Sequence, residues 1–223
     1  MKLTQLDKNE ALRYLGCRSE LSDERITALL DLCEKQLLDL ITPKYLYRVF
    51  DITSESEGVR ISDSDIILTG NDAAQHLEGC GRIVLMCATI GQGADNLIRR
   101  LQVSDMAAAV ITDSLASVAV EQVCDRAQEE ILSTLSYNTH TWRFSPGYGD
   151  LPLDIQKALI LLLDAPKKIG LCATDNQLLT PKKSVTAFIG LSDGEVSRKS
   201  RGCECCNMKD VCNFRKNGGH CGT

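Results

Sequence analysis

The sequence predicts an α+β fold in which N-terminal helices and a long central helix pack on a β-sheet. Apolar residues recur at three- and four-residue spacing in the first forty residues and again from about Ser104 to Leu135. This spacing is the period of a helix with one buried face. Short apolar runs that alternate with other residues, or that are rich in β-branched residues, occur between and after these segments and are typical of strands.

The first forty residues predict two helices. Leu12 and Leu15 mark the buried side of the first helix, which ends at Gly16. The second begins near Ser22, a residue type that caps helix N-termini, and stops before Pro43, which cannot continue a helix. Residues 1–42 therefore form a helical N-terminal part.

Six segments predict strands. One of them, Arg82–Ile90, is a continuous apolar run with β-branched residues, which indicates a buried central strand. The other five are Tyr45–Ile52, Val59–Ile61, Ile66–Thr69, Ile169–Ala173 and Ser184–Leu191.

Four further helices are expected at Asn71–Leu77, Asp95–Leu101, Ser104–Leu135 and Leu153–Asp164. The third of them is long for a globular protein, so we expect it to form the spine of the fold or to contain a break. An irregular segment, 137–152, rich in aromatic residues, Pro and Gly, precedes the last helix.

Length and charge limit the classes of function. The 223 residues fit one medium domain, with or without a small appendage. The formal charge of -5 provides no basic footprint, so nucleic acid is not an expected partner. No apolar run approaches the roughly 18–20 residues that span a bilayer, and the N-terminus lacks the apolar core of a signal peptide. The expected compartment is the cytoplasm.

The stretch 142–150, WRFSPGYGD, has the chemistry of a ligand-binding loop. Arg143 offers a planar fork that matches a carboxylate. Pro146 stiffens the chain, Gly147 lets the backbone approach a ligand, and Tyr148 supplies a hydroxyl and an aromatic face that attracts cations such as a sulfonium. Such a loop suits an amino-acid-like ligand with a positive group. The alternative is a loop packed by its own aromatic residues, with Arg143 in a structural ion pair.

This stretch also resembles a known motif, the S-adenosylmethionine-binding sequence Arg-x-x-x-Gly-Tyr of the activation domain of vitamin B12-dependent methionine synthase. Here it is Arg143-Phe-Ser-Pro-Gly147-Tyr148, continued to a proline as RFSPGYGDLPL, which is similar to the form in small stand-alone activation proteins. Three further segments resemble the same domain, and the likeness covers roughly residues 75–192. They are IVLMCATIGQGADNLI, DSLASVAVEQV and IGLCATDNQLLTPKKSVTAFIGL.

The composition turns polar after Ser192, so we expect the domain to span residues 1–195. The resemblance implies a mostly antiparallel twisted sheet within this domain, and it implies roles for single residues. Arg143 would grip the ligand's carboxylate, and Pro146, Gly147 and Tyr148 would line the site. Glu121 lies on the helix where the family carries acidic residues and is a further ligand-binding candidate. The family also has an acidic residue shortly before the arginine. Residues 137–142 contain none, so the ligand's amino group is expected to be held by another group, such as a backbone carbonyl.

The function implied by the resemblance is that of an accessory reactivation subunit. In the family, S-adenosylmethionine methylates oxidised cobalamin with one electron from a small electron-transfer protein. The cobalamin would be presented by a partner, either a corrinoid protein or a methionine synthase that lacks its own activation domain. The chain would then contribute positioning, while the cofactors carry the chemistry.

Five of the eleven cysteines gather near the C-terminus, in a tail that we place at residues 196–223. Cys203 and Cys206 have the C-x-x-C spacing that allows two thiolates to reach one metal ion. Zinc and an iron–sulfur cluster both fit thiolate ligands. The alternative is a reduced tail whose thiols bind metal only by chance. The candidate ligands are Cys203, Cys205, Cys206, Cys212 and Cys221.

Two other functions are compatible with parts of the sequence. One is a metal- or iron–sulfur-bearing redox or accessory protein of corrinoid metabolism that does not bind S-adenosylmethionine. The other is an S-adenosylmethionine-dependent methyltransferase, which the sequence disfavours because it lacks a glycine-rich strand-to-helix turn of the dinucleotide-binding type. Of the histidines, His76 is expected to cap or flank a surface helix, and His140 to be a solvated loop residue.

Overall fold

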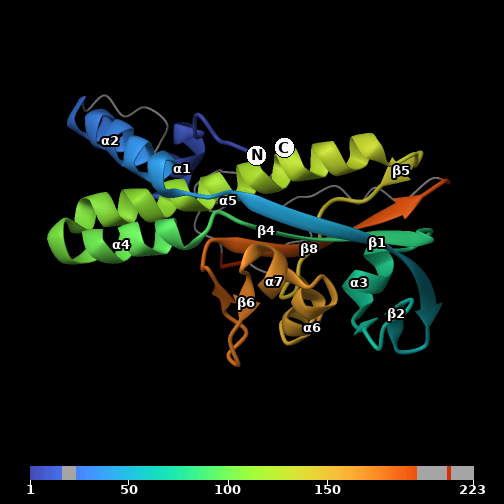
Figure 1. Ribbon diagram of the computed structural model, residues 1–223. Coiled ribbons are helices and arrows are strands. Elements are labelled where there is room, and N and C mark those ends of the chain that lie inside the picture. Colours follow the sequence, from blue (N-terminus) through green and yellow to red (C-terminus); the bar gives the residue numbers. More distant parts are fainter. Residues whose placement is uncertain (17–23, 195–209, 212–223) are drawn as a thin grey trace. The chain divides into compact units, whose positions relative to one another are not determined.

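The computed structural model describes residues 1–16, 24–194 and 210–211. These residues form a mixture of helices and strands, which confirms the predicted α+β class (Figure 1). The helices are α1 (Lys8–Tyr14), α2 (Glu24–Leu40), α3 (Asn71–His76), α4 (Gln92–Ser104), α5 (Met106–Thr134), α6 (Ile155–Leu162) and α7 (Ala165–Ile169). The strands are β1 (Lys44–Glu55), β2 (Gly58–Ile61), β3 (Ile67–Leu68), β4 (Arg82–Thr89), β5 (Thr139–His140), β6 (Cys172–Ala173), β7 (Leu179–Thr180) and β8 (Ser184–Ser192).

The main sheet has six strands in the order β3-β2-β1-β4-β8-β5, and β6 pairs with β7 in a separate ribbon. The pairs β1–β2, β2–β3 and β5–β8 are antiparallel. Strand β4 also runs opposite to β1, because Thr42 N–H donates to Ile90 O at 2.8 Å while Ile52 N–H donates to Gly81 O at 3.0 Å. The sheet is therefore mostly antiparallel, as expected, and β4 is buried at every position from Ile83 to Thr89.

The chain forms two compact units. The helical unit comprises Met1–Leu46, Cys87–Thr134 and Asp164–Val185. Among the described residues, the loop unit comprises Tyr47–Met86, Leu135–Leu163, 186–194 and 210–211. Strands β1, β4 and β8 contribute residues to both units.

Helix α5 is the centre of the helical unit and packs against α1, α2 and α4 (Figure 1). It is unbroken over 29 residues, so it forms the expected spine without the break. Its buried positions include many small residues such as Ala116 and Ala119, which let neighbouring helices approach closely. Among the described helices it is also long and apolar enough to cross a membrane, but 67% of its most apolar window is buried inside the protein, as in a core helix.

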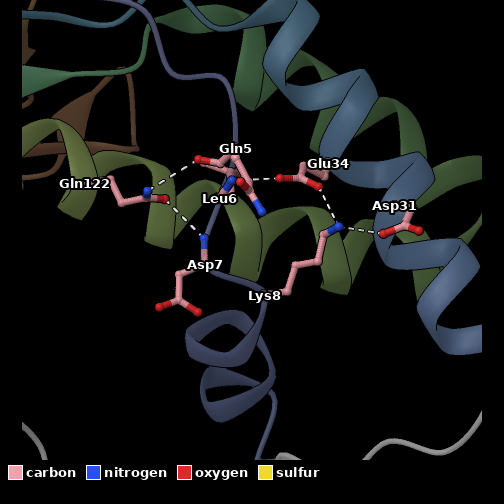
Figure 2. A network of polar contacts seen from close by, with 7 residues as sticks. All are labelled: Gln5, Leu6, Asp7, Lys8, Asp31, Glu34 and Gln122. Carbon is pink, nitrogen blue, oxygen red and sulfur yellow. Dashed lines mark hydrogen bonds and ion pairs between the residues drawn. The ribbon is translucent and has the colours of Figure 1, made fainter.

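Within this unit, polar side chains of α2 and α5 form hydrogen bonds and ion pairs with the N-terminal residues 5–8 (Figure 2). The buried carboxylate of Glu34 accepts the backbone N–H of Leu6 at 2.7 Å. The same carboxylate lies 2.8 Å from the ammonium of Lys8, which donates to Asp31 at 2.6 Å. Gln122 of α5 accepts the backbone N–H of Asp7, the residue after Leu6, at 3.3 Å. These bonds satisfy backbone groups that precede α1 and would otherwise lack partners.

In the loop unit, Ala73 of α3 and Leu77, the C-cap residue of this helix, are buried. The Cβ of a side chain at Gly190 of β8 would lie 3.0 Å from Leu77, so α3 approaches this strand closely. Large side chains from the strands fill the core of the unit. They are Ile61, Leu68, Ile83, Leu85, Met86 and Phe188.

The structure corrects one predicted strand. Ile169 was expected to begin a strand, but it ends the short helix α7, and the strand β6 contains only Cys172 and Ala173. A proline in the first turn and Gly170 in the left-handed conformation at the C-cap, with φ of 72°, define this helix. This order, proline at the start and glycine after the end, is favourable for a short helix. Helix α4 is longer than expected and α6 shorter, and the two-residue strands β5 and β7 were not expected.

Candidate functional site

The candidate ligand-binding loop, residues 142–150, follows β5 in the loop unit. Phe144 pairs with Phe188 of β8 through two backbone hydrogen bonds of 2.9 and 2.8 Å. Just before the loop, Thr141 N–H donates to Gly190 O at 2.9 Å, and the Thr141 hydroxyl accepts the Gly190 N–H at 2.8 Å. The first part of the loop therefore continues the sheet beside β8.

After Phe144 the chain turns sharply. Tyr148 N–H donates to Ser145 O at 3.0 Å, which closes a four-residue turn with Pro146 and Gly147 at its centre. Gly147 has φ of 87°. Proline followed by a residue with positive φ is the pattern of a type II turn. A Cβ at Gly147 would meet only Leu153, at 3.4 Å, so the glycine is required by its backbone conformation rather than by lack of space.

The side chains of Arg143 and Tyr148 lie in different environments. Arg143 is buried, with 7% of its surface exposed, and it makes at least one hydrogen bond, ion pair, ring contact or electrostatic interaction in the structure. A buried guanidinium is stable only among hydrogen-bond acceptors or opposite charges. A ligand carboxylate and a protein group both meet that requirement, so both interpretations of Arg143 remain predictions. Tyr148 is 55% exposed and presents its ring at the surface.

Aromatic rings surround the turn. The ring of Tyr148 lies 6.1 Å from that of Trp142 and 6.0 Å from that of Phe144. Phe144 contacts Phe188 with a centroid distance of 5.5 Å, and His76 of α3 contacts Trp142 at 4.6 Å. The loop is thus packed by its own aromatic residues, and Tyr148 forms the exposed edge of this cluster.

Helix α3 is hydrogen-bonded to both ends of the loop. The Asp150 carboxylate accepts the N–H of Asn71 at 2.7 Å and that of Asp72 at 3.0 Å. In return, the Asp72 carboxylate accepts the N–H of Asp150 at 3.2 Å. At the other end of α3, the Nε2 atom of His76 donates to Trp142 O at 2.9 Å, since a carbonyl can only accept.

These α3 contacts were not predicted from the sequence. His76 ends the mostly exposed helix α3 and is half-buried among the rings, whereas His140 is exposed but belongs to strand β5 rather than to a loop. Asp72 and Asp150 are separated by 78 residues in the chain, so no local spacing connects them. The available signal was Gly70 directly before the helix, because a glycine N-cap has no side chain and the first N–H groups need an acceptor from another segment.

Glu121 is not part of this loop. It is an exposed residue of α5 and belongs to the helical unit. Burial raises the pKa of Tyr14 to about 12, with smaller contributions from the charges of Glu10 and then Glu121. A role for Glu121 toward a ligand therefore remains a prediction.

The five tail cysteines proposed as metal ligands, Cys203, Cys205, Cys206, Cys212 and Cys221, lie outside the described residues. Within 1–16, 24–194 and 210–211, no three His, Cys, Asp or Glu side chains are grouped so that they could hold a metal ion. Among the described cysteines, Cys33, Cys87 and Cys124 are buried and take no part in a disulfide bond, and Cys172 is exposed. Burial raises the pKa of Cys87 to about 12.

Two surface hollows lie in the described part of the helical unit. One of about 500 Å³ is lined by polar residues that include Asp31, Glu34 and Lys35, and another of about 440 Å³ lies near Thr42. Residues of the loop 142–150 do not line either hollow.

No protein-family model and no curated protein sequence matches the chain. Among solved structures, one described as the MetH reactivation domain bound to AdoHcy is similar, with a TM-score of 0.62. The likeness covers 96% of this chain and 82% of that chain at 16% sequence identity. The chain therefore has the fold of the reactivation domain of this methionine synthase, which confirms the expected architecture.

Proposed function

We propose that the protein binds S-adenosylmethionine at the loop 142–150 and assists the reductive remethylation of cobalamin on a corrinoid-dependent methionine synthase or a related methyltransferase. The observation that carries the proposal is the shared fold. The neighbour with this fold, over 96% of the chain, was solved with AdoHcy, and this chain has an Arg-x-x-x-Gly-Tyr loop built into the same fold.

The residues of the loop fit the chemistry of such a ligand. Arg143 is buried, and a guanidinium binds a carboxylate more strongly in a desolvated site than in water. The exposed ring of Tyr148, with Trp142 beside it, offers π-electron density to a sulfonium cation. The type II turn at Pro146 and Gly147 fixes Tyr148 relative to Phe144. The loop thus combines a carboxylate-binding group and a cation-binding surface within six residues of sequence, from Arg143 to Tyr148.

In this proposal the chain holds and orients the methyl donor and takes no covalent part. When bound, S-adenosylmethionine would supply a methyl group. A partner would present the cobalamin, and a small electron-transfer protein would supply the electron. The partner would be a corrinoid protein or a methionine synthase without its own activation domain, and the expected compartment is the cytoplasm.

The test is a calorimetric titration of the purified protein with S-adenosylmethionine and, separately, with AdoHcy. Arg143→Ala should weaken binding by about 30-fold or more, since a lost charged hydrogen-bonded contact costs about 2 kcal/mol. Arg143→Lys keeps the charge but loses the planar fork, so it should also bind more weakly than the native protein. Arg100→Ala, at an exposed arginine of α4, is the matched control and should bind normally.

Thermal unfolding of each variant shows whether weaker binding follows from loss of the fold. A folded native protein that binds neither ligand at millimolar concentration contradicts the proposal. The metal- or iron–sulfur-bearing redox protein without S-adenosylmethionine binding would then be the leading alternative, and it depends on the cysteine tail.

A further inference from the structure

Helix α3 is tied to the loop at two points that bracket the ligand-binding residues. At one end, Trp142 O accepts a hydrogen bond from the His76 ring. At the other end, the Asp150 carboxylate accepts the backbone N–H groups of Asn71 and Asp72. Arg143 through Tyr148 lie between these two points in the sequence. The helix therefore fixes the entry and the exit of the loop.

We infer that Asp72, His76 and Asp150, termed here the α3 clamp, are positioning residues for the ligand: they hold the loop 142–150 in its binding shape. This inference rests on the proposed function and extends it to residues that contact the loop rather than the ligand.

The N-terminal end of the clamp replaces a helix cap. Gly70, the N-cap residue of α3, makes no side-chain cap hydrogen bond. The carboxylate of Asp150 takes that place and accepts the first two N–H groups of the helix, one with each oxygen. The fit is close, because a Cβ at Gly70 would collide with the Asp150 carboxylate. A Cβ at Gly149 would likewise collide with the carboxylate of Asp72.

The two aspartates therefore differ in what a substitution removes. Asp150 uses both oxygens as acceptors, Oδ2 for Asn71 and Oδ1 for Asp72. Asparagine has one acceptor oxygen, and its NH2 group would face a backbone donor. Asp72 accepts the Asp150 N–H through Oδ2, a contact that the oxygen of an asparagine can reproduce. Asp150→Asn should break the clamp, and Asp72→Asn should preserve it.

The C-terminal end of the clamp combines a hydrogen bond with ring packing. The His76 ring lies 4.6 Å from Trp142 and 4.9 Å from Phe144. His76→Phe keeps an aromatic ring at this position but removes the donor to Trp142 O. It therefore tests the hydrogen bond separately from the packing.

Trp142 is the one tryptophan of the chain, so its fluorescence reports on the loop directly. The experiment measures acrylamide quenching of Trp142 without ligand, and calorimetric affinity for S-adenosylmethionine, in the full-length protein. The variants are Asp150→Ala, Asp150→Asn, Asp72→Asn and His76→Phe. Asp154→Ala is the matched control, because Asp154 is an exposed aspartate just after the loop whose side chain makes no cap hydrogen bond.

Both Asp150 variants should raise the quenching of Trp142 and weaken binding roughly tenfold, which is less than for Arg143→Ala, because they loosen the loop without removing a contact with the ligand. His76→Phe should change both readouts in the same direction. Asp154→Ala should match the native protein, and Asp72→Asn, which keeps an acceptor oxygen for the Asp150 N–H, should change both readouts less than Asp150→Asn does. The difference between Asp150→Asn and Asp72→Asn would not arise from a general loss of stability.

If the folded Asp150→Ala and His76→Phe variants bind S-adenosylmethionine with the affinity of the native protein, the inference is overturned. Failure of the native protein to bind contradicts the proposed function itself, and with it the ligand-positioning role of the clamp. A change in Trp142 quenching in the Asp150 variants would then still show that α3 holds the loop. The two failures are therefore distinguishable.

Discussion

The ammonium of Lys8 lies 2.8 Å from the carboxylate of Glu34, which in turn accepts the backbone N–H of Leu6 (Figure 2). Hydrogen bonds to Asp31, first, and then to Glu34 raise the pKa of Lys8 above its ordinary value of 10.5. A raised pKa means that the charged lysine stabilises the folded state. This stabilisation is fully present below pH 10.5 and is lost as the pH rises through the higher folded-state pKa.

Lys8→Met should therefore lower the free energy of unfolding at pH 7 by about 0.2–1 kcal/mol, the range for ion pairs at the surface. The difference from the native protein should shrink above pH 10.5. Urea denaturation at a series of pH values measures both quantities. Lys35→Met, at an exposed lysine of the same region, is the control and should leave the free energy nearly unchanged. A difference that stays constant through the alkaline range would contradict this account.

The spine helix α5 provides a test of the core. Leu115 is fully buried in the cluster that joins α5 to its neighbours. Leu115→Ala should lower the free energy of unfolding by about 2–5 kcal/mol, because it removes buried apolar surface and leaves a cavity. Val110→Ala, on the same helix but 50% exposed, should change it by less than about 0.5 kcal/mol. Chemical denaturation of the two variants compares them directly.

The elements that the sequence predicted are those with a repeating pattern. Helices α2 and α5 and strand β4 extend over enough residues for their apolar periodicity to be recognised. Strands β5 and β7 contain two residues each, which is too short for any alternation to be visible. Ile169 was misassigned because an apolar β-branched residue suits either a strand or a short helix, and here proline and Gly170 decide for the helix.

For the loop, the residue types were informative but the supporting contacts were not. The pair Pro146-Gly147 is a local signal for a type II turn, and the structure forms one there. The pairing of Asp150 with Asn71 joins segments 79 residues apart. Neither segment has a pattern that requires the other, so this contact becomes visible only in the folded chain.

Thiol reactivity should follow burial. Burial raises the pKa of Cys80 to about 11 and that of Cys87 to about 12, whereas Cys172 is exposed. Only the thiolate attacks alkylating reagents. At pH 8 iodoacetamide should therefore modify Cys172 and leave Cys87 unmodified in the folded protein. Peptide mass spectrometry identifies the modified residues, and denatured protein, in which both should react, is the control. Equal labelling of the two in the native state would contradict the assigned burial.

The cysteine tail should carry metal if its C-x-x-C spacing has the proposed role. Purified protein should contain zinc, or iron with sulfide, and the double variant Cys203→Ser, Cys206→Ser should lose most of it, since both ligands of the pair are removed. Cys172→Ser, at an exposed thiol outside the tail, is the control and should keep its metal. Elemental analysis of the three proteins decides the question, and the same metal content in all of them would refute the tail as a metal site.

The turn at Gly147 links stability to binding. Its φ of 87° disfavours side chains, and a Cβ there would make an ordinary contact with Leu153 at 3.4 Å. Gly147→Ala should therefore destabilise the protein by about 1 kcal/mol through backbone strain rather than through a collision. Gly147→Asn should be tolerated better than Gly147→Ala, because asparagine occupies positive φ more readily than alanine.

The same strain should lower the affinity for S-adenosylmethionine, slightly in Gly147→Asn and more in Gly147→Ala. The reason is that the turn sets the position of Tyr148 through its hydrogen bond to Ser145. Thermal unfolding and calorimetric titration of the two variants measure the two effects. If asparagine were more harmful than alanine, side-chain size rather than backbone conformation would be the cause. If both lowered stability while affinity stayed at the native value, the turn would be a structural element that does not shape the ligand site.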